Sequence, residues 1–149
     1  MTTLTAILRS AYTHVLIGGG MNFDRKFVVW SLSYAATGMC LGIYMAMTKN
    51  HGELVAHAHL LLIGFVVSFI YGIIHRLWLD RPNRIIAMGQ FILHQAATII
   101  LFSGLFLLYG NFGPEAVLGP ILGIASLGVL IGVLLMLYMV LSTKPPNPA

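Results

Sequence analysis

The sequence has very few cysteines and very few charges. Cys40 is the only cysteine in 149 residues, which excludes an intrachain disulfide and a metal site built from several cysteines. Lys and Arg number eight, Asp and Glu number four, and charged residues make up only 8% of the chain. The basic residues stand singly or in small groups between apolar runs and do not cluster on one solvated face. We therefore expect no nucleic-acid partner.

What the chain has in quantity is apolar sequence. Hydrophobic residues make up 58% of it, more than a soluble domain of this length can bury. Lipid cannot satisfy a bare backbone, so each run long enough to cross a hydrocarbon layer of ~30 Å must be helical. None of the runs alternates in the way the strands of a membrane barrel do. The sequence predicts an all-α integral membrane bundle of four transmembrane helices, at residues 27–47, 54–78, 85–109 and 117–141.

The distribution of cations predicts the orientation of this bundle. Only Lys49 lies on the side of the first and third loops, whereas the other seven basic residues lie on the side shared by both termini. The positive-inside rule then places both termini in the cytoplasm. We expect a cytoplasmic amphipathic, interfacial segment at 1–24, a transmembrane domain at 25–143 and a cytoplasmic tail at 144–149. The lipid bilayer is the expected partner and a bacterial inner membrane the expected location.

Four of the six histidines lie inside the apolar runs: His57, His59, His75 and His94. Ionisable side chains inside a membrane are costly and commonly mark functional sites. His57 and His59 stand two positions apart, about 200° around a helix, so they project to nearly opposite sides and cannot ligate one metal from that helix. Each must serve a different neighbour, which means either two cofactors, or one cofactor and one hydrogen-bonding partner.

At helical spacing the face of His57 continues through small and polar groups, namely Gly64, Ser68, Tyr71 and His75. Such a stripe suits a flat macrocycle, with the His57 imidazole on iron and Gly64 leaving room for the porphyrin edge. The alternative is a packing seam between helices, with Gly64 and Ser68 at the contact. For His75, at the end of its run, the choice is between a weak ligand and an interfacial residue that snorkels to the surface.

The third run carries a polar stripe of Gln90, His94 and Thr98 at a spacing of four residues. His94 lies about ten residues into its run, near 15 Å depth, whereas His57 lies close to the opposite surface. This difference in height predicts that His94 holds a second metal or bonds to a cofactor edge. The alternative is a structural hydrogen bond to a Ser or Thr of a neighbouring helix.

The first and last runs offer less specific patterns. Cys40, with Met39, Met45 and Met47 nearby, supplies soft ligands of the kind that hold copper, and ordinary packing is the alternative. The last run contains the glycine pairs Gly119-x-x-x-Gly123 and Gly128-x-x-x-Gly132, which predict close packing against another helix.

The segment from His51 to Trp78, with its His-x-His at 57–59, resembles histidine-bearing helices in the catalytic subunit of haem-copper oxidases. Together with the stretch Tyr34–Met45, it looks like the small four-helix membrane proteins related to that subunit. The likeness covers the first three runs.

In the large oxidases one such helix gives an imidazole to each of two haems on its opposite sides, and the resemblance assigns these roles to His57 and His59. The chain has no His-His pair for copper, no Tyr-His crosslinking motif and four spans instead of twelve, so oxygen reduction with proton pumping is not expected.

The resemblance implies a haem b binding membrane protein with histidine axial ligands, acting in electron transfer with an unidentified redox partner or in binding O₂ or NO. Because twelve is three times four, we expect a homotrimer in which His57 binds one haem between protomers and His59 binds the next. Two alternatives remain open. One is a cofactor-free structural or assembly protein, and the other is a metal or proton transporter with His57, His59 and His94 as its relay.

Overall fold

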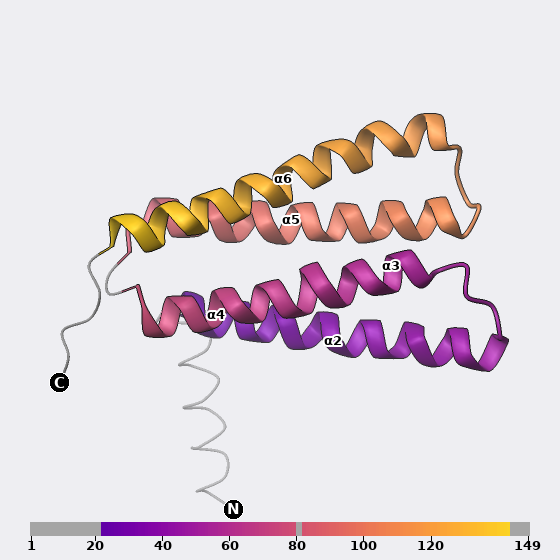
Figure 1. Ribbon diagram of the computed structural model, residues 1–149, viewed down its shortest axis with the longest axis horizontal. Coiled ribbons are helices and arrows are strands. Elements are labelled where there is room, and N and C mark those ends of the chain that lie inside the picture. Colours follow the sequence, from indigo (N-terminus) through magenta and orange to yellow (C-terminus); the bar gives the residue numbers. More distant parts are fainter. Residues whose placement is uncertain (1–21, 80–81, 144–149) are drawn as a thin grey trace, which may run out of the picture.

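The computed structural model describes residues 22–79 and 82–143, which form four helical rods (Figure 1). Three rods are single helices, α2 (Phe23–Thr48), α5 (Arg84–Tyr109) and α6 (Glu115–Ser142). The remaining rod joins α3 (Leu54–His59), the π-helix η2 (Leu60–Val67) and α4 (Ser68–Leu77). All four rods are long and apolar enough to cross a membrane. The all-α class and the four predicted helices are thus confirmed, and each helical rod is a candidate membrane span.

The predicted boundaries agree closely with the observed ones, the largest difference being the first span, expected from residue 27 and observed from Phe23. Most of the predicted interfacial segment, residues 1–21, lies outside the described residues, as does the predicted tail at 144–149. Residues 23 and 24, which were also assigned to the interfacial segment, belong to α2.

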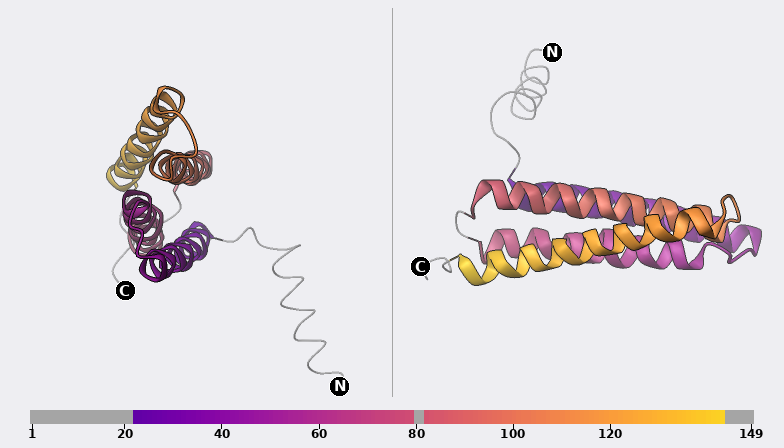
Figure 2. Two further views of the ribbon diagram at one scale, coloured as in Figure 1. Left: turned by 90° about the vertical axis from the view of Figure 1, so that its right-hand side faces the viewer. Right: turned by 90° about the horizontal axis from the view of Figure 1, so that it is seen from above.

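The rods form two antiparallel hairpins that pack against each other (Figures 1 and 2). In one hairpin α2 packs along η2 and α4, and in the other α5 packs along α6. Contacts of α5 with α2, α3 and η2 join the two hairpins. The start of α2, the end of α4, the start of α5 and the end of α6 all lie at one end of the bundle, which we call the basic end because Arg25, Lys26, Arg76 and Arg84 lie there. Which side of the membrane this end faces stays a prediction.

Two clusters of buried apolar side chains hold the bundle together. One lies towards the basic end and includes Phe27, Tyr71 and Met136, and the other lies towards the opposite end and includes Ala56 and Leu101. Outside these clusters many large apolar side chains are exposed, Ile85 to 83% and Met47 to 79% among them. Such a surface is stable next to lipid tails and unstable in water, which supports bilayer contact for these helices.

The π-helical segment η2 begins directly after His59. A π turn closes i→i+5 hydrogen bonds and so holds more residues than an α turn, and such turns are rare and often lie at functional sites. Through η2 the buried positions recur every fourth residue, at Ala56, Leu60, Gly64 and Ser68. His57 is half-buried, and like Gly64 it contacts α2. The predicted stripe is therefore buried from Gly64 to His75, and its first member, His57, is half-buried against α2.

Candidate functional site

His57 is held against the backbone of α2. Its Nδ1 lies 3.0 Å from the carbonyl oxygen of Gly38. A carbonyl only accepts, so Nδ1 carries the proton and donates it, which leaves Nε2 with a free lone pair. One turn further along α2, a Cβ at Gly42 would lie 3.1 Å from Cε1 of His57. The glycines of α2 thus let the imidazole approach the helix closely and fix its tautomer.

His59 is fixed in the same tautomer by its own helix. Its Nδ1 lies 2.8 Å from the carbonyl oxygen of Val55, one turn earlier, so this nitrogen also donates and Nε2 keeps its lone pair. Within the described residues Nε2 of His59 makes no hydrogen bond, and the same is true of Nε2 of His57. Both side chains are half-buried at the protomer surface. One imidazole therefore contacts α2 and the other contacts α3 itself, and each has one nitrogen free.

His94 lies inside the protomer. Its side chain is fully buried, and its Nε2 is hydrogen-bonded to Oγ of Ser68 across 3.1 Å. The ring packs edge-on against Tyr71, with 4.9 Å between ring centroids. Its Nδ1 is buried and has no partner among the described residues. The structure thus contains the interhelical hydrogen bond that the sequence left as one alternative, and a cofactor role for His94 stays a prediction.

The polar stripe of α5 is buried along its length, and it joins α5 to both neighbouring helices. Gln90 donates from Nε2 to the carbonyl oxygen of Gly132 on α6 across 3.3 Å. Gln95, which the sequence analysis did not select, accepts a 2.8 Å hydrogen bond from the Tyr34 hydroxyl of α2. Thr98 is 2% exposed. Neither the pairing of Tyr34 with Gln95 nor that of Gln90 with Gly132 has a local sequence signal, because each joins residues far apart in the chain.

At Gly64 and Ser68 the structure shows the packing that the sequence left as one alternative, and a cofactor role for them stays a prediction. A Cβ at Gly64 would lie 2.8 Å from Cγ of Tyr34, so the tyrosine ring occupies the space that a porphyrin edge would need. Ser68 is fully buried and bonded to His94. Both residues belong to a packing seam between helices, which explains their small side chains.

The glycine pairs of α6 behave differently from each other. A Cβ at Gly128 would lie 3.0 Å from Cβ of Ala97, and one at Gly132 would lie 3.5 Å from Cβ of His94. This pair packs closely against α5, as predicted. At Gly119 and Gly123 a Cβ would have no neighbour within 4 Å in the described part of the chain.

His75 is buried at the basic end, between two aromatic rings. Its imidazole stacks on Phe23 and Phe27, at centroid distances of 5.4 and 5.5 Å. It is 8% exposed, and its Nε2 has no hydrogen-bond partner in residues 22–79 and 82–143. The snorkelling interpretation is therefore wrong for His75 and fits its neighbour Arg76, whose side chain is 71% exposed.

The predicted copper ligands do not come together as a buried set. Cys40 is exposed, as are Met39 and Met47, whereas Met45 is buried. Across the described ranges no three side chains of the types His, Cys, Asp and Glu gather where they could hold a metal ion. A copper site stays a prediction without a structural observation to support it.

Comparison of the chain with protein-family models, with curated proteins and with solved structures gives no match. The candidate site consists of the imidazoles of His57 and His59 on α3. Without a relative, its function must be argued from the hydrogen bonds and the exposure of these two side chains.

Proposed function

We propose that this chain binds haem b through His57 and His59 and acts in electron transfer or in binding a diatomic gas. The observation that supports the proposal is that both imidazoles carry their proton on Nδ1. Each donates a hydrogen bond from Nδ1 to a backbone carbonyl, of Gly38 or of Val55, and keeps the Nε2 lone pair at the protomer surface. Metal-bound histidines almost always show this arrangement, because the carbonyl fixes the ring and raises the basicity of the ligating nitrogen.

Haem iron held by histidine supplies a one-electron couple, or a position for O₂ or NO where one axial site stays open. The residues of this chain hold and orient the ligands. The Gly38 carbonyl keeps the His57 ring in one tautomer, and Gly42 leaves space for it against α2. The Val55 carbonyl does the same for His59. The surrounding apolar side chains lower the local dielectric, which favours the form of iron with the smaller net charge.

The surface position of both ligating nitrogens favours haem between protomers over haem inside one protomer. His57 and His59 lie on different sides of α3, so one chain can contribute to two interfaces. In a closed ring of three chains each interface would receive His57 from one protomer and His59 from the next. We therefore propose a homotrimer with its haems at these interfaces.

The absorption spectrum tests the proposal. Full-length protein, expressed with excess haem precursor and purified in mild detergent, should show a Soret band and sharp α and β bands on reduction. His57→Ala and His59→Ala should each lower the haem content measured as pyridine haemochrome. His51→Ala is the matched control, because His51 is an exposed histidine just before α3.

Colourless but folded wild-type protein would overturn the haem proposal, and so would a spectrum unchanged in both ligand variants. Carbon monoxide separates the two activities. A shifted reduced spectrum indicates an open axial site and gas binding, and an unshifted one indicates two axial ligands and electron transfer. Native mass spectrometry tests the oligomer, where a haem-loaded monomer or dimer would contradict the trimer.

A second candidate function rests on one of the same contacts. The hydrogen bond from His57 to Gly38 joins α3 to α2, so it also suits a cofactor-free structural or assembly protein. This candidate expects colourless protein that His57→Ala destabilises. The first candidate expects loss of colour in the same variant.

A further inference from the structure

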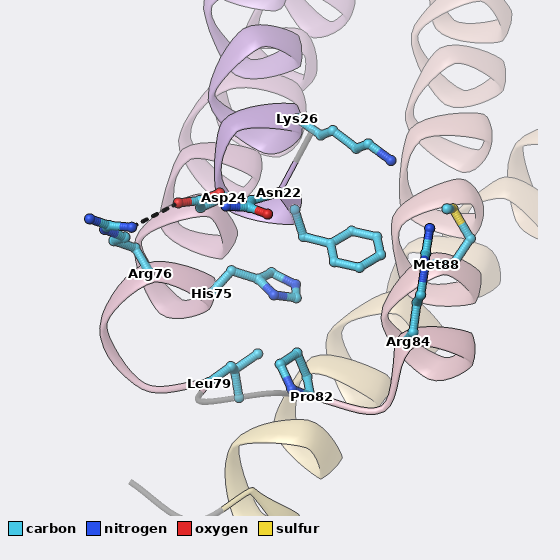
Figure 3. A pocket seen from close by; sticks show the side chains of 10 residues that line it. Asn22, Asp24, Lys26, His75, Arg76, Leu79, Pro82, Arg84 and Met88 are labelled. Atoms are coloured by element: carbon cyan, nitrogen blue, oxygen red, sulfur yellow. Dashed lines mark ion pairs between the residues drawn. The ribbon is translucent and has the colours of Figure 1, made fainter. Parts of the chain in front are cut away.

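A polar pocket of about 510 Å³ opens at the basic end of the bundle. It lies where the start of α2, the end of α4 and the start of α5 come together (Figure 3). Asn22 and Asp24 line it from α2 and its N-cap, Arg76 and Leu79 from α4 and the following turn, and Arg84 from α5. The pocket lies at the opposite end of the bundle from His57 and His59, so it is independent of the proposed haem site.

The described lining of this pocket carries more positive than negative charge. Lys26, Arg76 and Arg84 contribute cations, and Asp24 contributes a carboxylate. Asp24 lies 3.8 Å from Arg76, whose side chain is mostly exposed to solvent, so this pairing is weak. Figure 3 shows Lys26 and Arg84 extending from facing helices across the pocket from this pair. An anion between them would gain two charge-assisted contacts.

His75 gives the pocket a buried polar atom that lacks a partner. Its ring points from α4 into the pocket in Figure 3, and Nε2 has no hydrogen-bond partner among the described residues although the side chain is more than nine-tenths buried. Buried polar atoms in folded proteins are nearly always hydrogen-bonded, so an orphaned one in a side chain that lines a pocket is a place where a bound group can supply the missing partner. Stacking between Phe23 and Phe27 holds the ring in this position.

The depth and the size of the pocket point to the class of ligand. The pocket lies at the ends of apolar helices that are long enough to cross a bilayer, which is the level of the lipid headgroups. Because one water molecule takes about 30 Å³ of liquid volume, 510 Å³ holds far more than a phosphate ion. Basic pockets between membrane helices are known binding sites for anionic headgroups.

We propose that this pocket binds the phosphate of an anionic phospholipid, with Lys26 and Arg84 contacting its oxygens and His75 Nε2 completing the site. Free inorganic phosphate carries the same chemistry but would leave most of the volume empty. An experiment can distinguish the phospholipid from free phosphate, because only the lipid has acyl chains that can lie along the apolar surfaces of α2 and α5.

Lipid binding to the full-length protein in a non-ionic detergent tests this proposal by native mass spectrometry. The probes are phosphatidylglycerol, phosphatidylcholine and inorganic phosphate. We expect phosphatidylglycerol to bind more tightly than phosphatidylcholine. Lys26→Gln and Arg84→Gln should each weaken its binding about five-fold, because one cation near a membrane surface is worth about 1 kcal/mol. Arg25→Gln is the matched control, because Arg25 is the neighbour of Lys26 but does not line the pocket.

His75→Phe provides an independent variant that keeps the aromatic stack and removes Nε2. It should weaken phosphatidylglycerol binding without changing the binding of phosphatidylcholine.

Equal weakening by Arg25→Gln and Lys26→Gln would overturn the proposal, because it would show attraction to the basic end in general. Equal binding of the two lipids would overturn it as well. Competition by millimolar inorganic phosphate, with no preference for the lipid, would assign the pocket to a free anion instead. None of these measurements depends on haem, so their outcome is separate from that of the proposed function.

Discussion

The imidazole of His94 on α5 is hydrogen-bonded to the hydroxyl of Ser68 on α4, with 3.1 Å between Nε2 and Oγ and with both side chains fully buried. The bond joins the two hairpins of the bundle near its middle. Nδ1 of His94 has no hydrogen-bond partner among the described residues, so the serine hydroxyl is the one side chain there that bonds to this imidazole.

Replacing Ser68 by Ala should destabilise the protein by about 1 kcal/mol, because it removes the side-chain hydrogen bond of a buried imidazole. Unfolding by SDS, followed by circular dichroism, measures the change. Ser33→Ala is the control, since Ser33 is exposed and bonds only to the backbone of its own helix. If Ser68→Ala also abolished the Soret band at unchanged stability, a purely structural role for the pair would be wrong.

Replacing Gly64 by Ala should also destabilise the protein, by about 1–3 kcal/mol. The new methyl group would lie 2.8 Å from Cγ of Tyr34, and moving that ring strains the hydrogen bond from Tyr34 to Gln95. Thermal unfolding in detergent measures the effect. Gly89→Ala is the matched control, because Gly89 is a helical glycine with no neighbour near its Cβ. It should be neutral or slightly stabilising, since alanine favours the helix. Equal effects of the two substitutions would contradict the packing seam.

Replacing Gly42 by Ala should weaken haem binding without removing a ligand. Its methyl group would press on Cε1 of His57 and disturb the hydrogen bond to Gly38, and the loss of such supporting contacts typically costs 10–100-fold in metal affinity. Titration of the apoprotein with haem, followed at the Soret band, measures the change. Gly89→Ala serves again as the control. An unchanged affinity in Gly42→Ala would show that the position of the His57 ring does not govern binding.

Glu53 should make the protein less stable as the pH rises. It stands directly before α3, outside the membrane span, and burial raises the pKa of its carboxyl above the ordinary value of 4.5. The folded state therefore favours the neutral form. This contribution to stability is complete below the pKa of the unfolded chain and disappears as the pH rises through the raised pKa of the folded protein.

Melting temperatures of the wild type and of Glu53→Gln across this pH range test the prediction. The substitution should remove part of the decline with pH, because glutamine does not ionise. Glu115→Gln is the control, since Glu115 is exposed in the first turn of α6. A decline that Glu53→Gln leaves unchanged would assign the pH dependence to other groups.

The fold was largely predictable from sequence because long apolar runs have one stable form in a bilayer. The run that became α5 was expected at 85–109 and is observed at Arg84–Tyr109. The π-helix was not predictable, because Leu60–Val67 contains no proline and no polar residue that would mark a change of helix type.

The candidate site was predictable only in its residue types. The spacing of His57 and His59 indicated two separate neighbours, but their hydrogen-bond partners depend on how the helices pack. The choice for Gly64 between a porphyrin edge and a helix seam depended on where Tyr34 lies, 30 positions earlier in the chain. Local sequence carries no information on that pairing.

The wide turns of η2 also determine the direction in which the histidine pair points. If the same residues of η2 wound as an ordinary α-helix, each would turn by about 100° where the π-helix turns by less, and α3 would be rotated by about 100° relative to α4. His57 would turn away from the glycines of α2 while the basic end kept its place. The direction of the two rings is therefore set by how this segment winds more than by the side chains that it carries.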